Sequence, residues 1–168
     1  CGCANLIIFI EFVLFAEIIY KNMSIALSEA VRALDNNEIP VGCIIVKNNK
    51  IIGKGYNQVE KLNDPTAHAE IIAITAACNC LGSKYLDNCE LYVTLEPCVM
   101  CIGAISLARI QTVYFGAFEP KFGACGSLFN IPENRLLNHS PKVYSGIYAE
   151  YSEDLLKEFF TKKRLNNN

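Results

Sequence analysis

Residues 91–101 read Leu-Tyr-Val-Thr-Leu-Glu-Pro-Cys-Val-Met-Cys, an apolar run that leads into a proline and two cysteines. The run at 91–95 predicts a buried strand, and Pro97 is favoured in the first turn of a helix, here expected over 97–108. Cys98 and Cys101 then share one face of that helix, where the free N–H groups of its first turn favour thiolates. The stretch therefore predicts a strand followed by a helix that presents two metal ligands.

A second motif at 64–70 reads Asp-Pro-Thr-Ala-His-Ala-Glu. Asp64 followed by Pro65 is a helix-start signal, so we expect a helix from here to Cys80 with His68 in its first turn. Residues two apart on a helix point about 200° apart. How His68 and Glu70 both face one site therefore stays open at the level of sequence.

His68, Cys98 and Cys101 form a ligand set that leaves one position of a tetrahedral zinc ion open, as catalytic zinc requires. Taken alone, the cysteine pair is equally typical of a redox pair or of half a structural zinc knuckle, and a lone histidine is usually a core or capping residue. A knuckle needs a second pair, which the spacing of Cys78 and Cys80 does not provide. Together the motifs favour one catalytic Zn²⁺ per subunit.

The composition indicates one globular domain and excludes a disordered chain, since 52% of the 168 residues are hydrophobic. The net charge of −2 gives no global basic field for nucleic acid. Nine cysteines without a convincing secretory signal favour a reducing, cytoplasmic location.

We expect residues 1–16 to be an apolar N-terminal extension, of either native or non-native origin, and residues 17–168 to be the single domain. The apolar run at 6–20 is too short and too interrupted by glutamates to span a membrane, so we expect no membrane partner.

Apolar runs that alternate with helical patterns predict an α/β fold, a three-layer α/β/α sandwich with a five-stranded mixed sheet. Strands are expected at 41–46, 50–55, 91–95, 112–116 and 142–145, with Asn48-Asn49 as the turn of a hairpin. Outside the two motifs, helices are expected at 17–35 and near the C-terminus, where Ser152 is the expected cap.

These motifs resemble the zinc nucleobase deaminases and, more narrowly, the bacterial tRNA-specific adenosine deaminases, which convert the wobble adenosine of an anticodon to inosine. The resemblance extends from about Ile19 to Arg164. The matching stretches are Ile39–Gly42, Asn57, Asp64–Glu70, Leu91–Cys101, Ala108–Ile110, Lys121, Gly123–Ala124, Gly126–Ser127, Asn138–His139 and Phe159–Phe160. It implies a cytidine-deaminase-like fold, a homodimer, and a tRNA anticodon stem-loop as partner.

The resemblance also implies a role for each site residue. It makes His68, Cys98 and Cys101 the zinc ligands and Glu70 the catalytic proton shuttle between the attacking water, a ring nitrogen and the departing amine. The residues that it implies for substrate binding are Asn57, Glu119, Lys121, Asn138 and His139, with phosphate contacts also from the basic end at 162–164. From the residues alone, Asn57 is equally a strand-end turn residue, and His139 equally a solvent-facing loop residue.

Three positions depart from the family pattern in the loop expected to meet the RNA. Phe118 and Glu119 stand where the family usually has Arg and Asp, and Phe122 stands where it often has Thr or a small residue. Glu119 still offers a carboxylate acceptor, on a side chain that reaches further than that of the family's Asp. The two phenylalanines suit either base stacking or contacts in the core or a dimer interface.

Two other functions remain open. A deaminase of a free base or nucleoside, of the guanine or cytosine type, would use the same zinc motif. The lead-in at 64–66, the loop at 121–127 and the basic C-terminal end favour tRNA over this alternative. A non-catalytic zinc-binding module is the second, and Glu70 argues against it because zinc binding alone does not require that carboxylate.

Overall fold

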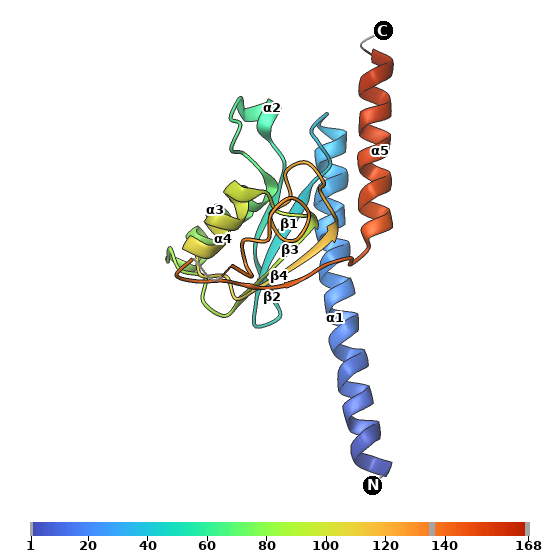
Figure 1. Ribbon diagram of the computed structural model, residues 1–168, viewed down its shortest axis with the longest axis vertical. Helices are drawn as coiled ribbons and strands as arrows, with labels where there is room; N and C mark the ends of the chain where they lie inside the picture. The colour runs from blue at the N-terminus through green and yellow to red at the C-terminus, as the bar shows by residue number, and fades with distance from the viewer. Residues whose placement is uncertain (1, 135–136, 167–168) are drawn as a thin grey trace.

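A five-stranded mixed sheet lies at the centre of the protein, whose computed structural model describes residues 2–134 and 137–166 (Figure 1). The strands are β1 (Gly42–Lys47), β2 (Lys50–Tyr56), β3 (Cys89–Leu95), β4 (Thr112–Ala117) and β5 (Lys142–Tyr144). Their order is β2-β1-β3-β4-β5, with β1 antiparallel to both neighbours and β3, β4 and β5 parallel. Asn48 and Asn49 both adopt positive φ, 50° and 60°, as a two-residue hairpin turn requires.

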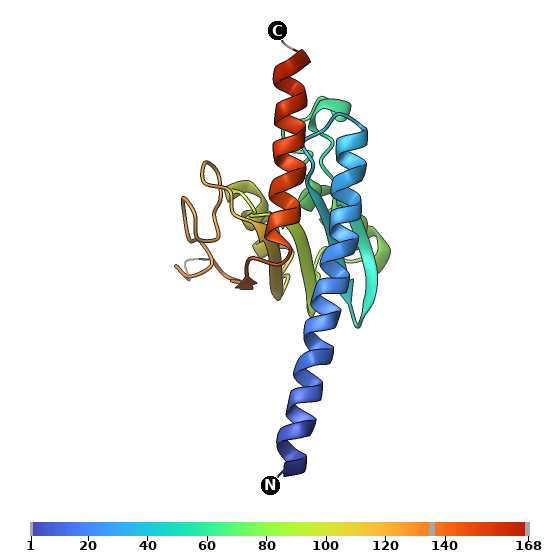
Figure 2. The same ribbon diagram turned by 90° about the vertical axis from the view of Figure 1, so that its right-hand side faces the viewer.

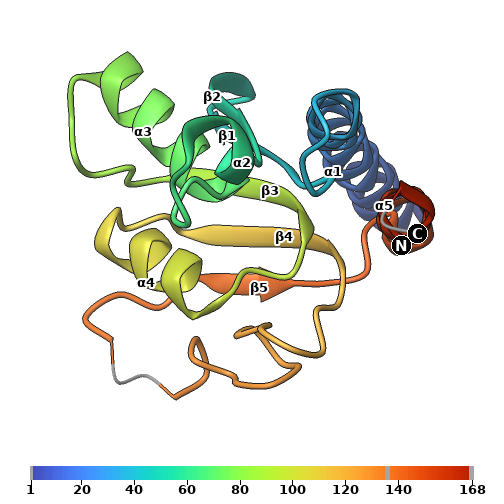
Figure 3. The same ribbon diagram turned by 90° about the horizontal axis from the view of Figure 1, so that it is seen from above.

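Helices cover both faces of the sheet, α1 and α5 on one side and α3 and α4 on the other (Figure 3). The helices are α1 (Gly2–Asp35), α2 (Val59–Leu62), α3 (Ala69–Leu81), α4 (Val99–Leu107) and α5 (Ala149–Asn166). Ile44 and Tyr92 pack with Met23 of α1, whereas Val93 and Phe115 belong to the cluster under α3 and α4. The predicted three-layer α/β/α sandwich is thus confirmed.

The first helix begins earlier than predicted, at Gly2 rather than Glu17. The segment contains no proline, so nothing in it interrupts helical hydrogen bonding. Met23 and Ala26 are fully buried against the sheet, while Phe12 is 67% exposed where α1 extends past it (Figure 2). Among the described helices, none combines the length and the hydropathy needed to cross a membrane.

The other three long helices also start at residues different from those predicted, and α4 begins at Val99 rather than at Pro97. The Asp64 carboxylate accepts hydrogen bonds from the backbone N–H and the hydroxyl of Thr66, at 2.8 and 2.7 Å, and this local turn delays α3 to Ala69. At the C-terminal helix, α5 starts at Ala149, so Ser152 lies inside the helix instead of capping it. Its hydroxyl donates to the Tyr148 carbonyl, four residues back.

The close approach of β2 and α3 sets the position of the site. A Cβ on Gly55 would lie 2.3 Å from the carbonyl oxygen of Ala69 and 2.7 Å from the backbone nitrogen of Ala73, so only glycine fits between strand and helix. This contact brings the start of α3 to the end of β2, where Asn57 follows. The equivalent end of β3 leads directly into α4.

Candidate active site

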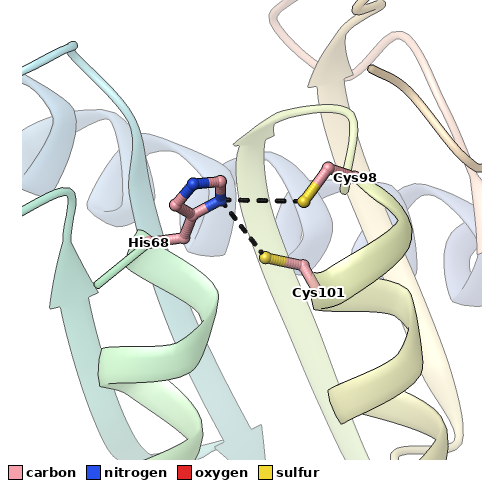
Figure 4. Close-up of side chains that lie close together, drawn as sticks. All are labelled: His68, Cys98 and Cys101. Atoms are coloured by element: carbon pink, nitrogen blue, oxygen red, sulfur yellow. Dashed lines mark hydrogen bonds between the residues drawn. The ribbon is translucent and has the colours of Figure 1, made fainter. Parts of the chain in front are cut away.

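The three predicted ligands meet where α3 and α4 begin (Figure 4). His68 is the N-cap of α3 and Cys98 the N-cap of α4, so neither lies in the first helical turn as expected, while Cys101 does. At His68 the backbone is extended, with φ −67° and ψ 155°. This explains how His68 and Glu70 both reach the site, because the helical spacing between side chains applies only from Ala69 onward.

The ligand atoms fit a zinc ion. His68 Nδ1 lies 3.7 Å from Cys98 Sγ and 3.5 Å from Cys101 Sγ, and all three ligand atoms lie within 4.8 Å of one another. Tetrahedral zinc with ordinary Zn–N and Zn–S bond lengths separates nitrogen from sulfur by about 3.6 Å. The donor set of one imidazole and two thiols is also one that zinc prefers. The site therefore suits a single Zn²⁺ with one position free.

The two thiols differ in acidity. A hydrogen bond from Cys101 lowers the pKa of Cys98 to about 4, against the opposing effect of partial burial. The same hydrogen bond is the main reason why the pKa of Cys101 is raised far above its ordinary value, and burial is the second reason. The pKa of His68 is raised, chiefly by its hydrogen bond with Cys98. The site thus stabilises a thiolate, the form in which cysteine binds zinc.

Glu70 is the one carboxylate in the first turn of α3, and it is only 4% exposed. Burial raises its pKa, with smaller opposing contributions that include the charge of His68. A raised pKa makes a carboxyl group a better proton acceptor than an exposed carboxylate, and once protonated it can pass the proton on. The position and the chemistry of Glu70 therefore suit a proton shuttle.

A cleft of about 580 Å³ opens above these residues. That size lies within the range of small-ligand sites and accommodates a nucleoside. His68, Glu70 and Cys98 form its floor, and the predicted substrate residues Asn57, Glu119 and Lys121 also line it.

Asn57 is held by a residue that the sequence analysis missed. Its Nδ2 donates to Glu38 Oε2 at 3.1 Å, and the fully buried Glu38 also accepts from the backbone N–H groups of Glu60 and Lys61. Because a carboxylate accepts only from the amide nitrogen, Asn57 keeps its Oδ1 and second N–H for a ligand. The sequence signal for Glu38 was its position between a helix and an apolar strand, because a charged side chain buried there needs hydrogen-bond partners.

The loop at 118–127 forms the outer wall of the cleft and contributes Glu119, Lys121 and Phe122. Glu96, also unassigned from the sequence, accepts hydrogen bonds from this loop with its buried carboxylate. Burial alone would raise the pKa of Glu96, but its hydrogen bonds with Ser127, Glu119 and Cys125 lower it. The loop is thus built around a buried negative charge.

Two predicted RNA contacts lie away from the cleft within this chain. The Nε2 N–H of His139 donates to the Ile110 carbonyl at 2.6 Å, and the His139 carbonyl accepts from Ser106 near the end of α4. Asn138 is exposed beside it. Cys98 stands at the opposite end of α4, so the structure does not bring Asn138 and His139 to the zinc ligands, and their contact with RNA stays a prediction.

The two phenylalanines of the loop occupy different surroundings. Phe118 packs edge-on against Phe115 of the core, with ring centroids 5.1 Å apart. Phe122 is 67% exposed and lines the cleft together with Phe160 of α5. Beyond Phe160, the basic end of α5 is exposed. Phe122 is therefore better placed than Phe118 to stack on a bound base.

Comparison with known proteins agrees with this site. The family model for the cytidine and deoxycytidylate deaminase zinc-binding region matches residues 17–117. The tRNA-specific adenosine deaminase of Aquifex aeolicus is 51% identical over 144 residues, which cover 86% of this chain and 95% of that protein. A structure from a study of A-to-I editing by tRNA:A34 deaminases has a TM-score of 0.79 and 43% identity, over 81% of this chain and 99% of that one.

A guanine deaminase from Bacillus subtilis is also 43% identical, but with a TM-score of 0.57 over 58% of this chain and 63% of that one. The likeness to the tRNA enzymes spans nearly their whole length, including the wall of the cleft. The chain therefore belongs to the tRNA-specific adenosine deaminases, zinc-dependent hydrolytic enzymes of the cytidine and deoxycytidylate deaminase family.

Proposed function

We propose that this protein deaminates the wobble adenosine of a tRNA anticodon stem-loop to inosine and releases ammonia. The observation that carries the proposal is the composition of the cleft. Its floor joins a zinc ligand set to the buried Glu70, and its rim carries an exposed cation and exposed aromatic rings at Lys121, Phe122 and Phe160. Such a rim suits the phosphates and unstacked bases of a single-stranded loop.

The side chains around the cleft divide the reaction between them. His68, Cys98 and Cys101 would hold Zn²⁺, which supplies an activated water at neutral pH. Glu70 takes a proton from the attacking water and passes it to N1 of the adenine ring while the oxygen bonds to C6. Glu70 then moves a second proton to the amino group, which leaves as ammonia. Asn57, oriented by Glu38, offers its free amide atoms to the nucleoside.

The decisive experiment compares substrates. Zinc-loaded protein is incubated with an anticodon stem-loop bearing a wobble adenosine, and separately with free adenosine, guanine and cytidine, and released ammonia is measured. We expect ammonia from the stem-loop, together with inosine at the wobble position. Ammonia from a free base or nucleoside alone would replace this function by that of a guanine- or cytosine-type deaminase.

We propose that the enzyme is a homodimer in which the α4 helices of the two subunits form the interface. This helix contains no charged residue, Val99 and Leu107 on it are 49% and 81% exposed, and an apolar face of this kind marks an interface. A Cβ on Gly103 would meet no atom within 4 Å, so Gly103→Lys fits the single chain and disturbs only an interface. Light scattering after gel filtration should give a dimer for the parent and a monomer for the variant. A monomeric parent, or a variant that stays dimeric, would contradict the proposal.

We also propose that residues 17–168 are the deaminase domain, that residues 1–16 lie outside it, and that the enzyme works in the cytoplasm. The exposure of Ile10, Phe12 and Leu14 supports the boundary. A reducing compartment suits the free thiols that the zinc site needs. Removal of residues 1–16 should leave deamination of the stem-loop unchanged, and loss of activity with the fold intact would refute the boundary.

A further inference from the structure

Among the residues that the structure describes, the hydrogen-bond partners of the Glu96 carboxylate all come from one segment, the 118–127 loop. Oε1 accepts from the backbone N–H groups of Cys125 and Ser127, at 2.9 and 3.0 Å. Oε2 accepts from the backbone N–H of Glu119 at 3.0 Å and from the hydroxyl of Ser127. The side chain is 3% exposed. Both oxygens are therefore saturated by donors from the two ends of the loop.

The loop closes on this carboxylate at contact distance. A Cβ on Gly123 would lie 2.3 Å from Glu96 Oε2 and 2.5 Å from the carbonyl oxygen of Glu119, so only glycine fits there. The Gly123 N–H donates to the same carbonyl at 2.8 Å, and the Ala124 N–H donates to the Pro97 carbonyl at 2.9 Å. Backbone N–H groups that converge in this way form a concave anion site, filled here by the protein's own side chain.

The place of Glu96 in the chain connects this loop to the zinc ligands. Glu96 directly follows the last residue of β3, and Cys98 lies two residues further on. The side chains that the loop directs into the cleft are Glu119, Lys121 and Phe122. We propose that Glu96 is a positioning residue for RNA recognition, which holds these side chains at a fixed place relative to the reacting base. The role rests on the proposed function, since it assumes that the rim meets RNA.

The amide variant Glu96→Gln tests the charge with little change of shape. An amide NH₂ at the Oε1 position would face two backbone N–H groups, and at the Oε2 position it would face the Glu119 N–H. Either orientation breaks at least one hydrogen bond to the loop, because two donors cannot pair. Ser127→Ala is the milder variant, since it removes the hydroxyl donor and leaves the backbone bonds in place. Glu90→Gln is the control, since the Glu90 carboxylate, on the strand that precedes Glu96, accepts from the Tyr92 hydroxyl and not from the loop.

The first measurement is steady-state kinetics with the anticodon stem-loop, alongside zinc content. For Glu96→Gln we expect a KM raised about 10-fold or more, a kcat within about threefold of the parent, and one zinc per chain. Ser127→Ala should raise KM severalfold, and Glu90→Gln should leave it unchanged. An unchanged KM in both loop variants, or a fall confined to kcat or to zinc content, would overturn the role.

The second measurement is amide hydrogen exchange, which needs no substrate. The backbone N–H groups of Glu119, Cys125 and Ser127 should exchange faster in Glu96→Gln than in the parent, while those of α3 stay protected. Equal exchange at the three loop amides would overturn the proposal. A parent enzyme inactive on the stem-loop would instead refute the proposed function, and it would leave this exchange result to decide whether Glu96 holds the loop. If Glu96→Gln does not fold, Ser127→Ala carries both measurements.

Discussion

The floor and the rim of the cleft are built in opposite ways. On the floor, Glu70 is buried and His68 and Cys98 are half-buried, and all three lie at the starts of α3 and α4. On the rim, Lys121 and Phe122 are exposed and belong to one loop. The motif residues lie on the floor, while two of the positions that we expect to depart from the family pattern, Glu119 and Phe122, lie on the rim. This contrast supports our proposal that the rigid framework holds the catalytic groups while the loop carries RNA recognition.

The largest effect expected from a change on the floor is at Glu70. Glu70→Gln removes the proton acceptor but keeps a side chain of similar size, and Glu70→Ala removes the side chain beyond Cβ. Both should keep zinc, because the proposed ligands are His68, Cys98 and Cys101, and both should lower kcat by about 10²–10⁴-fold. Inosine formation in the stem-loop and zinc per chain are the two measurements. Normal turnover in a zinc-loaded variant would remove Glu70 from the mechanism.

The next largest effect is expected at Asn57, between floor and rim. Asn57→Ala leaves one acceptor position of Glu38 unpaired in the interior, so stability should fall by about 1–3 kcal/mol and kcat/KM by about 10-fold or more. Asn57→Asp should lower stability further, because two carboxylates would then meet where the amide and Glu38 lie 3.1 Å apart. Thermal melts and stem-loop kinetics measure both effects. Gln58→Ala is the control, since that side chain makes no capping hydrogen bond, and equal effects at 57 and 58 would contradict the role of Asn57.

The same contrast explains what could be predicted from sequence. The clustering of His68, Cys98 and Cys101 could be predicted because short motifs place these residues at two helix starts, and the strands could be predicted because apolar runs mark them. The N-cap positions of His68 and Cys98 could not be predicted. The start of α3, for example, depends on the local turn at Asp64. Short-range helix signals do not reveal which of several nearby residues will begin the helix.

Glu38 and Glu96 show a second limit. Their hydrogen-bond partners lie 19 to 31 residues away in the chain and are largely backbone N–H groups. Every residue except proline carries such a donor, so no residue type identifies these partners. The supports of the site therefore become visible only once the fold brings the donors together.

On the rim itself, a moderate effect is expected at Phe122. If its exposed ring stacks on a base, Phe122→Ala should raise KM for the stem-loop about 10-fold, since such stacking contributes about 1–3 kcal/mol per base. Thermal stability should stay unchanged because the ring is 67% exposed. Phe118→Ala is the matched control and should behave in the reverse way, lowering the melting temperature through its contact with Phe115. An effect of Phe118→Ala on KM larger than that of Phe122→Ala would assign base stacking to the other ring.

The smallest effect is expected at Lys121, and it separates charge from shape on the rim. A lysine that contacts one phosphate displaces about one counterion, so Lys121→Ala should weaken stem-loop binding severalfold and reduce the slope of log affinity against log salt by about 0.7–0.9. Lys50→Ala, at the hairpin end of β2 and so at the far end of that strand from Asn57, should leave the slope unchanged. Equal slopes for the parent and Lys121→Ala would show that the rim recognises RNA without this charge. Recognition would then rest on Phe122 and on the loop shape that Glu96 maintains.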